Sequence, residues 1–252
     1  MLAFLPWVLL ASHLTPSTGQ NQAVNSAIVP VTHNRDFPLY DWMPRHETIL
    51  AHHLKFKPDV VFIGDSITHR FGGEPIGTTT DHTPLTGKPV WDKQFAHWKP
   101  SNLGFGYDRT ENVLWRIQHG EIDGIRPRAF VFLIGTNNLG LNTPEQIRDG
   151  MVAILDAVHA KHPRAQLLVL GLLPRNQSPN APERATVKAI NALYAGIKKP
   201  KVEFLDIGDR FLEPDGSIST NVMFDFLHPM ELGYAKFAEG IVPTLAKWLD
   251  HK

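Results

Sequence analysis

The chain has 252 residues, which is enough for one large domain with a buried core. Its 25 Lys and Arg residues equal its 25 Asp and Glu residues, so the formal net charge is zero. Non-specific attraction to nucleic acid or to an anionic membrane needs a basic excess, so neither is an expected partner. The sequence contains no cysteine. This excludes disulfides, thiolate metal sites, a cysteine nucleophile and a lipid anchor on an N-terminal cysteine.

The N-terminal segment resembles a secretory leader. Leu2–Ala11 is an apolar run too short to span a bilayer, which takes about 20 residues, but it has the length of a signal-peptide core. Small residues at Ser17 and Gly19 suit cleavage just after them. No Lys or Arg precedes the run, which leaves a fortuitous apolar start as the alternative. We predict a signal peptide over 1–19, a linker or N-terminal extension over 20–41, a secreted or periplasmic location and no stable membrane anchor.

The rest of the chain alternates between strand and helix patterns. A short helix is expected at 42–56, where apolar residues recur at helical spacing. Apolar runs then predict strands, and amphipathic segments between and after them predict helices. The strands are expected at Val60–Gly64, Ser101–Gly104, Ala129–Ile134, Gln166–Leu172 and Val202–Asp206, and the helices at Thr110–Gln118, Pro144–Lys161, Pro182–Lys198 and Glu231–Leu249. This order predicts one α/β domain over 42–252, with a parallel sheet covered by helices on both faces.

Polar residues cluster just beyond the expected strands. The first strand is followed by Asp65 and Ser66, the second ends at Gly104, and the third is followed by Asn137. A further polar segment, which contains His228, precedes the last helix. Parallel α/β sheets bind ligands beyond the carboxyl ends of their strands, so we expect these residues to meet at one edge. The long irregular stretch from 71 to 88 follows the serine closely and is expected to be functional or mobile.

These residue types suit acyl transfer. Ser66 would be the nucleophile, His228 the base that takes its proton, and Asp225 the group that orients His228. Three donors could hold an oxyanion: the N–H of Ser66 at the start of a helix, the N–H of Gly104, and the side-chain amide of Asn137.

Each of these residues also has an ordinary structural explanation. A serine after a strand is more often a helix cap than a nucleophile. Asp225 and His228 could be a capping acid and a surface histidine, and Asn137 could hold a turn. The joint occurrence of these candidate residues at strand ends favours a catalytic role for them. A phosphate- or flavin-binding role is weaker, because Asp65 beside the serine would repel an anion.

Four motifs together resemble the GDSL, or SGNH, hydrolase family, and within it the branch of the platelet-activating-factor acetylhydrolase catalytic subunits and their bacterial relatives. The motifs are "GDSI" at 64–67, "NLGFGYDRTENVLWRI" at 102–117, "GTNN" at 135–138 and "DFLH" at 225–228. The resemblance implies a three-layer, flavodoxin-like fold with five parallel strands. It also implies an acyl-enzyme mechanism without metal or cofactor, in which Ser66, Asp225 and His228 are catalytic and Ser66, Gly104 and Asn137 form the oxyanion hole.

The expected function is therefore a serine esterase acting on short-chain, mainly acetyl, esters of a small molecule or carbohydrate. Ile67, Thr136 and Leu227 each neighbour a catalytic residue and are candidates to wall a small acyl pocket. A phospholipid or lysophospholipid acylhydrolase is the first alternative, and a non-catalytic binding module is the second. Three aromatic residues near the long loop could stack on a sugar or contact an acyl chain, or simply pack in the core; they are Trp91, Phe95 and Trp98. The oligomeric state stays open, with a homodimer as one option.

Overall fold

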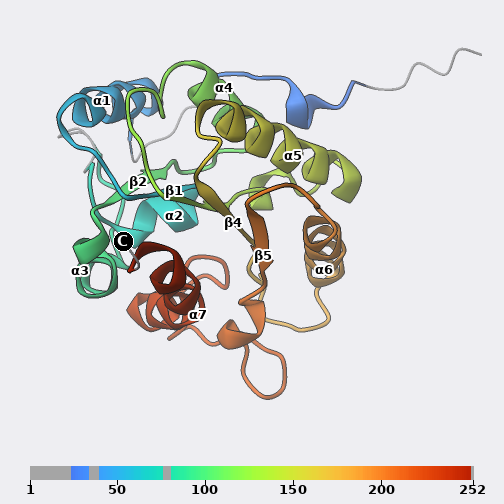
Figure 1. Ribbon diagram of the computed structural model, residues 1–252. Helices are drawn as coiled ribbons and strands as arrows, with labels where there is room; N and C mark the ends of the chain where they lie inside the picture. Colours follow the sequence, from blue (N-terminus) through green and yellow to red (C-terminus); the bar gives the residue numbers. More distant parts are fainter. Residues whose placement is uncertain (1–23, 34–39, 76–80, 251–252) are drawn as a thin grey trace, which may run out of the picture.

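A computed structural model describes residues 24–33, 40–75 and 81–250 and contains one five-stranded sheet (Figure 1). All strand pairs are parallel and the spatial order is β2-β1-β3-β4-β5. The strands are β1 (Val60–Gly64), β2 (Pro100–Gly104), β3 (Ala129–Leu133), β4 (Gln166–Leu170) and β5 (Val202–Leu205). The predicted parallel α/β fold is confirmed, with strand ends that differ from the predicted ones by two residues at most.

Helices cover both faces of the sheet, which explains why the inner strands are apolar throughout. The helices are α1 (Trp42–Lys55), α2 (Ser66–Phe71), α3 (Lys88–Gln94), α4 (Thr110–Gln118), α5 (Pro144–Lys161), α6 (Pro182–Ala195) and α7 (Glu231–Leu249). Figure 1 shows α3 and α7 on one side of the sheet and α4 and α5 on the other, with α6 beside α5. Every residue of β1 and β3 is buried, whereas β5 at the sheet edge is half-exposed.

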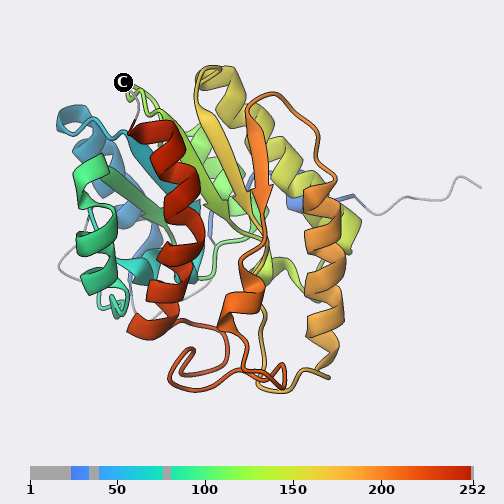
Figure 2. The same cartoon turned by 60° about the horizontal axis from the view of Figure 1, so that its bottom comes forward.

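The strands all point toward the edge where the functional residues are expected. In Figure 2 they run downward, and the long orange segment that links β5 to α7 lies below their ends. In the sheet, β2 and β3 lie on opposite sides of β1, so the direction in which successive strands are added reverses after β2. Ligands of open α/β sheets bind beyond the carboxyl ends at such a point of reversal.

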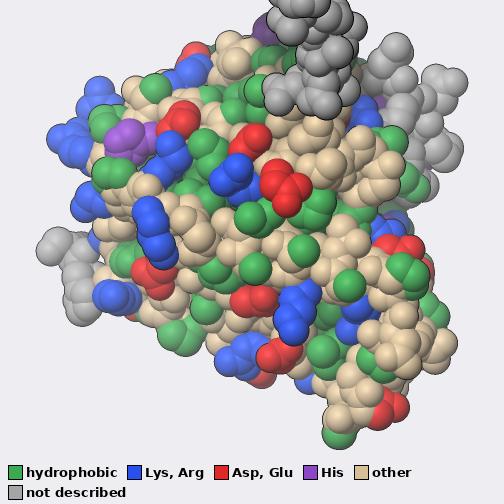
Figure 3. All heavy atoms as spheres, turned by 90° about the vertical axis from the view of Figure 1, so that its right-hand side faces the viewer, with side chains coloured by type: hydrophobic (Ala, Val, Ile, Leu, Met, Phe, Trp, Pro, Cys, Tyr) green, Lys and Arg blue, Asp and Glu red, His purple; other side chains and the backbone are tan. Residues whose placement is uncertain are grey.

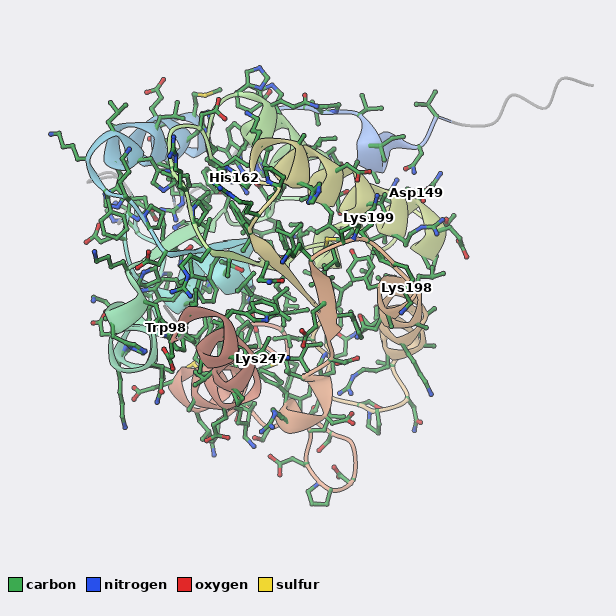
Figure 4. All side chains as sticks on the ribbon, viewed as in Figure 1. Trp98, Asp149, His162, Lys198, Lys199 and Lys247 are labelled. Carbon is green, nitrogen blue, oxygen red and sulfur yellow. The ribbon has the colours of Figure 1, made fainter. Side chains whose placement is uncertain are left out.

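The three aromatic residues that could have stacked on a sugar or contacted an acyl chain belong to the core. Trp91, Phe95 and Trp98 expose only 2%, 0% and 5% of their surface. Trp98 lies between α3 and α7, and its indole nitrogen donates to Asp250 at 2.7 Å (Figure 4). They therefore stabilise the contact between α3 and α7, and a stacking role with substrate is excluded by their burial.

Part of the predicted linker is packed against the domain. Ala27 is fully buried, and its carbonyl accepts a hydrogen bond from the Thr110 hydroxyl at 2.9 Å. The Asn112 amide donates to the carbonyl of Val31 at 3.0 Å. Within the predicted linker or N-terminal extension, residues 24–33 therefore include a part that packs against α4. The predicted signal peptide, 1–19, lies outside the described residues, and none of the described helices is long and apolar enough to cross a membrane.

The surface over α5, α6 and β5 carries both signs of charge side by side (Figure 3). Lys199, which follows α6, pairs with Asp156 of α5 at 2.6 Å and ties the two helices together (Figure 4). Exposed pairs of this kind contribute little to stability, about 0–1 kcal/mol. The mixed pattern on this face agrees with the zero net charge of the chain.

A fully buried charge cluster lies beneath the turn that follows β2. The Arg116 guanidinium donates to Asp108 at 2.8 Å and also pairs with Glu121, and none of these three side chains is exposed to solvent. Trp42 donates to the second oxygen of Asp108 at 2.7 Å. Burial raises the pKa of Asp108 to about 6, although Arg116 and Trp42 oppose the shift. Arg116 is therefore the cation on which the two buried acids depend.

Replacing Arg116 with Ala is expected to lower the free energy of unfolding by about 3–5 kcal/mol, because it removes the guanidinium that pairs with the buried carboxylates of Asp108 and Glu121. Urea denaturation at neutral pH measures this change. Arg126→Ala is the matched control: this arginine is exposed, and its loss should change stability by less than about 0.5 kcal/mol. Equal, small effects of both substitutions would contradict the role assigned to Arg116.

Candidate active site

Ser66 lies at the junction between β1 and α2. The strand ends at Gly64, and Asp65 then caps the helix, its Oδ1 accepting from the N–H of Ile67 at 2.9 Å. Ser66 is the first residue of α2, so its N–H has no acceptor within the helix and lies at the positive end of the helix dipole. Its side chain is partly exposed at the edge of the sheet. The cap is thus Asp65, which leaves the serine hydroxyl available for another role.

Three side chains predicted to act together are hydrogen-bonded in series. Ser66 Oγ lies 2.9 Å from His228 Nε2, and His228 Nδ1 lies 2.7 Å from Asp225 Oδ2. A neutral imidazole whose Nδ1–H donates to Asp225 presents a lone pair on Nε2 to the hydroxyl. This arrangement can take the serine proton and so activate the oxygen as a nucleophile.

The turn that carries the acid and the base is held by its own backbone. Asp225 Oδ1 accepts from the N–H of Leu227 at 3.1 Å and from that of His228 at 2.8 Å. Phe226 adopts a positive φ of 61°, and its carbonyl accepts from Asn176 at 2.9 Å. The Asp225 carboxylate therefore fixes the turn with one oxygen and orients the imidazole with the other.

The charges around the imidazole keep it neutral. Burial lowers the pKa of His228, the Asp225 carboxylate opposes this, and the positive charges of Arg70 and Arg175 lower it further. For Asp225, burial raises the pKa, but the hydrogen bonds from His228 outweigh it and the pKa lies below its ordinary value. Near neutral pH the pair is therefore a carboxylate and a neutral imidazole, which are the protonation states that a general base requires.

Asn137 presents its amide next to the turn that follows β2. It belongs to a short 3-10 helix after β3, and its Nδ2 donates one hydrogen to the carbonyl of Asp108 at 3.0 Å. The second hydrogen of that amide remains for an oxyanion. The neighbouring Asn138 is buried and holds the turn instead, accepting from Thr110 N–H at 3.1 Å and donating to Glu111 at 2.9 Å. The two asparagines thus have different roles.

Gly104 does not fit the predicted role of oxyanion donor. Its N–H donates to Oδ1 of Asn102 at 2.8 Å and is therefore occupied. The glycine is needed for another reason, since a Cβ there would lie 2.1 Å from the backbone nitrogen of His69 in α2. Asn102 also donates to the carbonyls of Thr68 and Gly72, so it fastens α2 to β2. Of the three predicted oxyanion donors, the N–H of Ser66 and the amide of Asn137 fit this geometry.

The three candidates for an acyl pocket have different surroundings. Ile67 and Thr136 are buried, with 2% and 4% exposure, and Leu227 is partly buried against the core. Thr136 is held by Arg175, which donates to its carbonyl and hydroxyl oxygens at 3.2 Å. Their role in acyl binding stays a prediction.

Sequence patterns did not single out the cations beside the imidazole. The ring of Phe224 stacks on His228 with centroids 6.0 Å apart, and the guanidinium of Arg70 lies over Phe224 at 5.5 Å. Arg175 lies in the segment between β4 and α6, and its positive charge lowers the pKa of both His228 and Asp65. The only available signal was the spacing of Ser66 and Arg70, which places them on one side of a helix.

Asp65 is not the exposed negative charge that the sequence suggested. It exposes 1% of its surface, and burial raises its pKa to about 7, although the hydrogen bond from Ile67 opposes the shift. Its Oδ2 has no hydrogen-bond partner among the described residues. The expected repulsion of an anion at this edge is correspondingly weak.

A large hollow elsewhere on the molecule does not belong to this site. It has a volume of about 670 Å³ and is lined by residues that precede β3 and β4, including Arg126 and Arg164, and by Trp248 near the end of α7. It therefore lies at the amino ends of the strands, opposite Ser66. Within the described part of the chain, no group of three or more His, Asp or Glu residues is arranged to hold a metal ion.

The sequence model of the GDSL-like lipase/acylhydrolase family matches residues 62–236. The chain belongs to this family. Human platelet-activating factor acetylhydrolase IB subunit alpha1 is 36% identical to it over 210 residues, which cover 82% of this chain and 84% of that protein. The chain is therefore an ester-hydrolysing enzyme of the GDSL family, as the four motifs predicted.

Solved structures share the fold of this GDSL-family enzyme. A GDSL-like lipase from Bacteroides thetaiotaomicron has a TM-score of 0.62 at 16% identity, covering 81% of this chain and 98% of that one. An acetylxylan esterase from Geobacillus stearothermophilus has a TM-score of 0.57 at 14% identity, covering 78% and 98%. At such identities the likeness concerns the fold, and it confirms the predicted SGNH-type architecture.

The acid limb of kcat/KM for a neutral ester should have its midpoint below pH 6.5, the ordinary pKa of histidine, because the pKa of His228 is lowered. Activity requires the neutral imidazole, so a lower pKa preserves activity to lower pH, and activity is lost as the pH falls through that value. Initial rates between pH 4 and 8, with a stability control at each pH, measure the midpoint. A midpoint above 6.5 would contradict the electrostatic account of the site.

Proposed function

We propose that the protein is a serine esterase that removes acetyl or other short acyl groups, mainly from carbohydrate, through an acyl-enzyme intermediate. One observation carries the proposal: the hydrogen bonds that join Ser66, His228 and Asp225 at 2.9 and 2.7 Å. A non-catalytic binding module would not need this series, and membership of an acylhydrolase family argues against it.

In the proposed mechanism, Ser66 Oγ attacks the ester carbonyl while its proton passes to His228 Nε2. The N–H of Ser66 and the amide of Asn137 stabilise the oxyanion. The intermediate collapses when His228 gives the proton to the departing alcohol. A water molecule then loses a proton to His228 and attacks the acyl group on Ser66. His228 returns this proton to Ser66 Oγ as the bond to the acyl group breaks and the acid leaves. Asp225 orients the ring and stabilises the imidazolium in both steps.

Separate observations support the choice of acyl group and alcohol. The proposal of a small acyl group rests on the position of Ile67 and Thr136, which directly neighbour Ser66 and Asn137 in the chain. The predicted export and the zero net charge support a polar, carbohydrate alcohol, and among proteins with this fold is an acetylxylan esterase.

A phospholipid or lysophospholipid acylhydrolase is the second candidate. It is favoured by the 36% identity to a platelet-activating factor acetylhydrolase subunit. The same nucleophile, base and oxyanion donors would serve both substrates, since the bond cleaved is a carboxylic ester in each case.

Release of acid from a set of esters distinguishes these possibilities. We expect acetate release from acetylated xylo-oligosaccharides to exceed release from an acetylated phospholipid, and acetyl 4-nitrophenyl ester to react faster than the octanoyl ester. Ser66→Ala should abolish all of these activities, and Asn137→Ala should reduce kcat by about 10²–10³.

Circular dichroism and unfolding curves of both variants serve as folding controls. Equal turnover of acetyl and octanoyl esters would remove the short-acyl proposal. Activity that survives in folded Ser66→Ala would remove the serine mechanism.

A further inference from the structure

We propose that Arg70 forms an anion-binding subsite beside the catalytic histidine, so that the preferred ester carries a negatively charged group, a carboxylate or a phosphate, on its alcohol portion. This inference rests on the proposed esterase function and specifies its substrate class. It starts from Arg70, a cation that influences His228 but takes no part in the bond-making and proton-transfer steps.

The position of Arg70 follows from the helix that carries the nucleophile. Arg70 is four residues after Ser66 in α2, so the two side chains leave the helix on the same side, with Cβ atoms about 5–6 Å apart. The guanidinium is then fixed over the Phe224 ring at 5.5 Å, and that ring stacks on His228. The cation thus borders the imidazole as well as the serine.

This neighbourhood corresponds to the alcohol side of a bound ester. His228 gives its proton to the departing alcohol oxygen, so groups that flank the imidazole lie next to the alcohol portion. Asn137 and Thr136 lie together after β3 and mark the side where the oxyanion and acyl group are expected. An anionic substituent on the alcohol would therefore be placed toward Phe224 and Arg70.

The Arg70 guanidinium is partly exposed and forms no ion pair with any described residue. Two acids are close enough to act on the site, and both are committed: Asp225 to His228 and its turn, and Asp65 to the cap of α2. Asp65 is also buried, with a pKa raised to about 7, so it offsets little of the positive charge. A second cation, Arg175, adds to the positive potential felt by His228.

Phe224 supports the same assignment. It exposes 43% of its surface although it is a large apolar side chain. Its ring positions the planar guanidinium, which lies over it at 5.5 Å, and arginine binds carboxylate or phosphate through two parallel hydrogen bonds. Thr86 and Gly87, at the end of the long loop, border this region. The N–H of Gly87 donates to the carbonyl of Arg70 at 3.0 Å, and the hydroxyl of Thr86 donates to the carbonyl of Pro229 at 3.0 Å.

The test compares matched acetyl esters that differ only in charge. One pair is an acetylated methyl glucuronoside and its carboxylate methyl ester; the other is acetylglycerol phosphate and acetylglycerol. The first pair reports on an acidic sugar and the second on a phosphate group of the kind found in lipid headgroups. The kcat and KM values are measured for the wild type, Arg70→Gln, Arg70→Lys and Arg164→Gln. Arg164 is exposed at the opposite end of the strands and serves as the matched control.

We expect the wild type to prefer the anionic member of at least one pair by about tenfold in kcat/KM, mainly through KM. The rates are compared at pH 8, where His228 is neutral with or without the charge of Arg70. Arg70→Gln should then bring this ratio close to one by raising KM for the anionic ester, Arg70→Lys should give an intermediate ratio, and Arg164→Gln should leave the ratio unchanged. Added salt should reduce the wild-type preference.

A wild-type enzyme that hydrolyses all four esters without preference for charge would overturn the subsite and leave the esterase proposal intact. Equal losses on both members of a pair in Arg70→Gln would also overturn it, because they would indicate that Arg70 only supports α2 or Phe224. No hydrolysis of any ester above the Ser66→Ala background would instead reject the proposed function, and the subsite with it.

Discussion

The hydrogen bond between Ser66 and His228 joins two segments that are 162 positions apart in the chain. One segment is the start of α2 and the other is the turn before α7, and each is built independently of the other. One link between them is direct: Tyr234 of α7 donates to the carbonyl of Ile67 at 2.6 Å. The other passes through the loop before α3, where the N–H of Gly87 donates to the carbonyl of Arg70 and the hydroxyl of Thr86 to that of Pro229. The catalytic geometry therefore depends on how α2 and α7 are placed against the same face of the sheet.

The edge strand β2 contributes to the site without touching the nucleophile. Asn102 fastens α2 from below, and Gly104 lets the helix approach because it has no Cβ. The turn after β2 is held by the buried Asp108, whose backbone carbonyl orients Asn137. A buried ion cluster is costly unless every charge is paired, which is the case for Asp108 with Arg116. The buried pair of Asp108 and Arg116 therefore fixes the turn that positions the Asn137 amide.

Sequence patterns located Ser66, Asp225 and His228 because each follows or precedes an element with strong apolar periodicity, and because the carboxyl ends of parallel strands share one edge. They failed for Gly104, since a sequence does not reveal that a side chain two residues earlier occupies its N–H. They left Trp91 ambiguous, because aromatic residues at helical spacing suit a core as well as a binding surface. Arg70 gained significance only when folding placed Phe224 between it and the imidazole.

The central claim is that His228 activates Ser66, and covalent labelling tests it most directly. The folded protein is treated with a fluorophosphonate, digested and analysed by mass spectrometry, alongside His228→Ala. The account predicts one adduct on the peptide that contains Ser66 in the wild type, and labelling at least a hundredfold slower in the variant, on the order expected for loss of an activating base. An adduct on a different residue, or equally fast labelling of Ser66 without the imidazole, would contradict it.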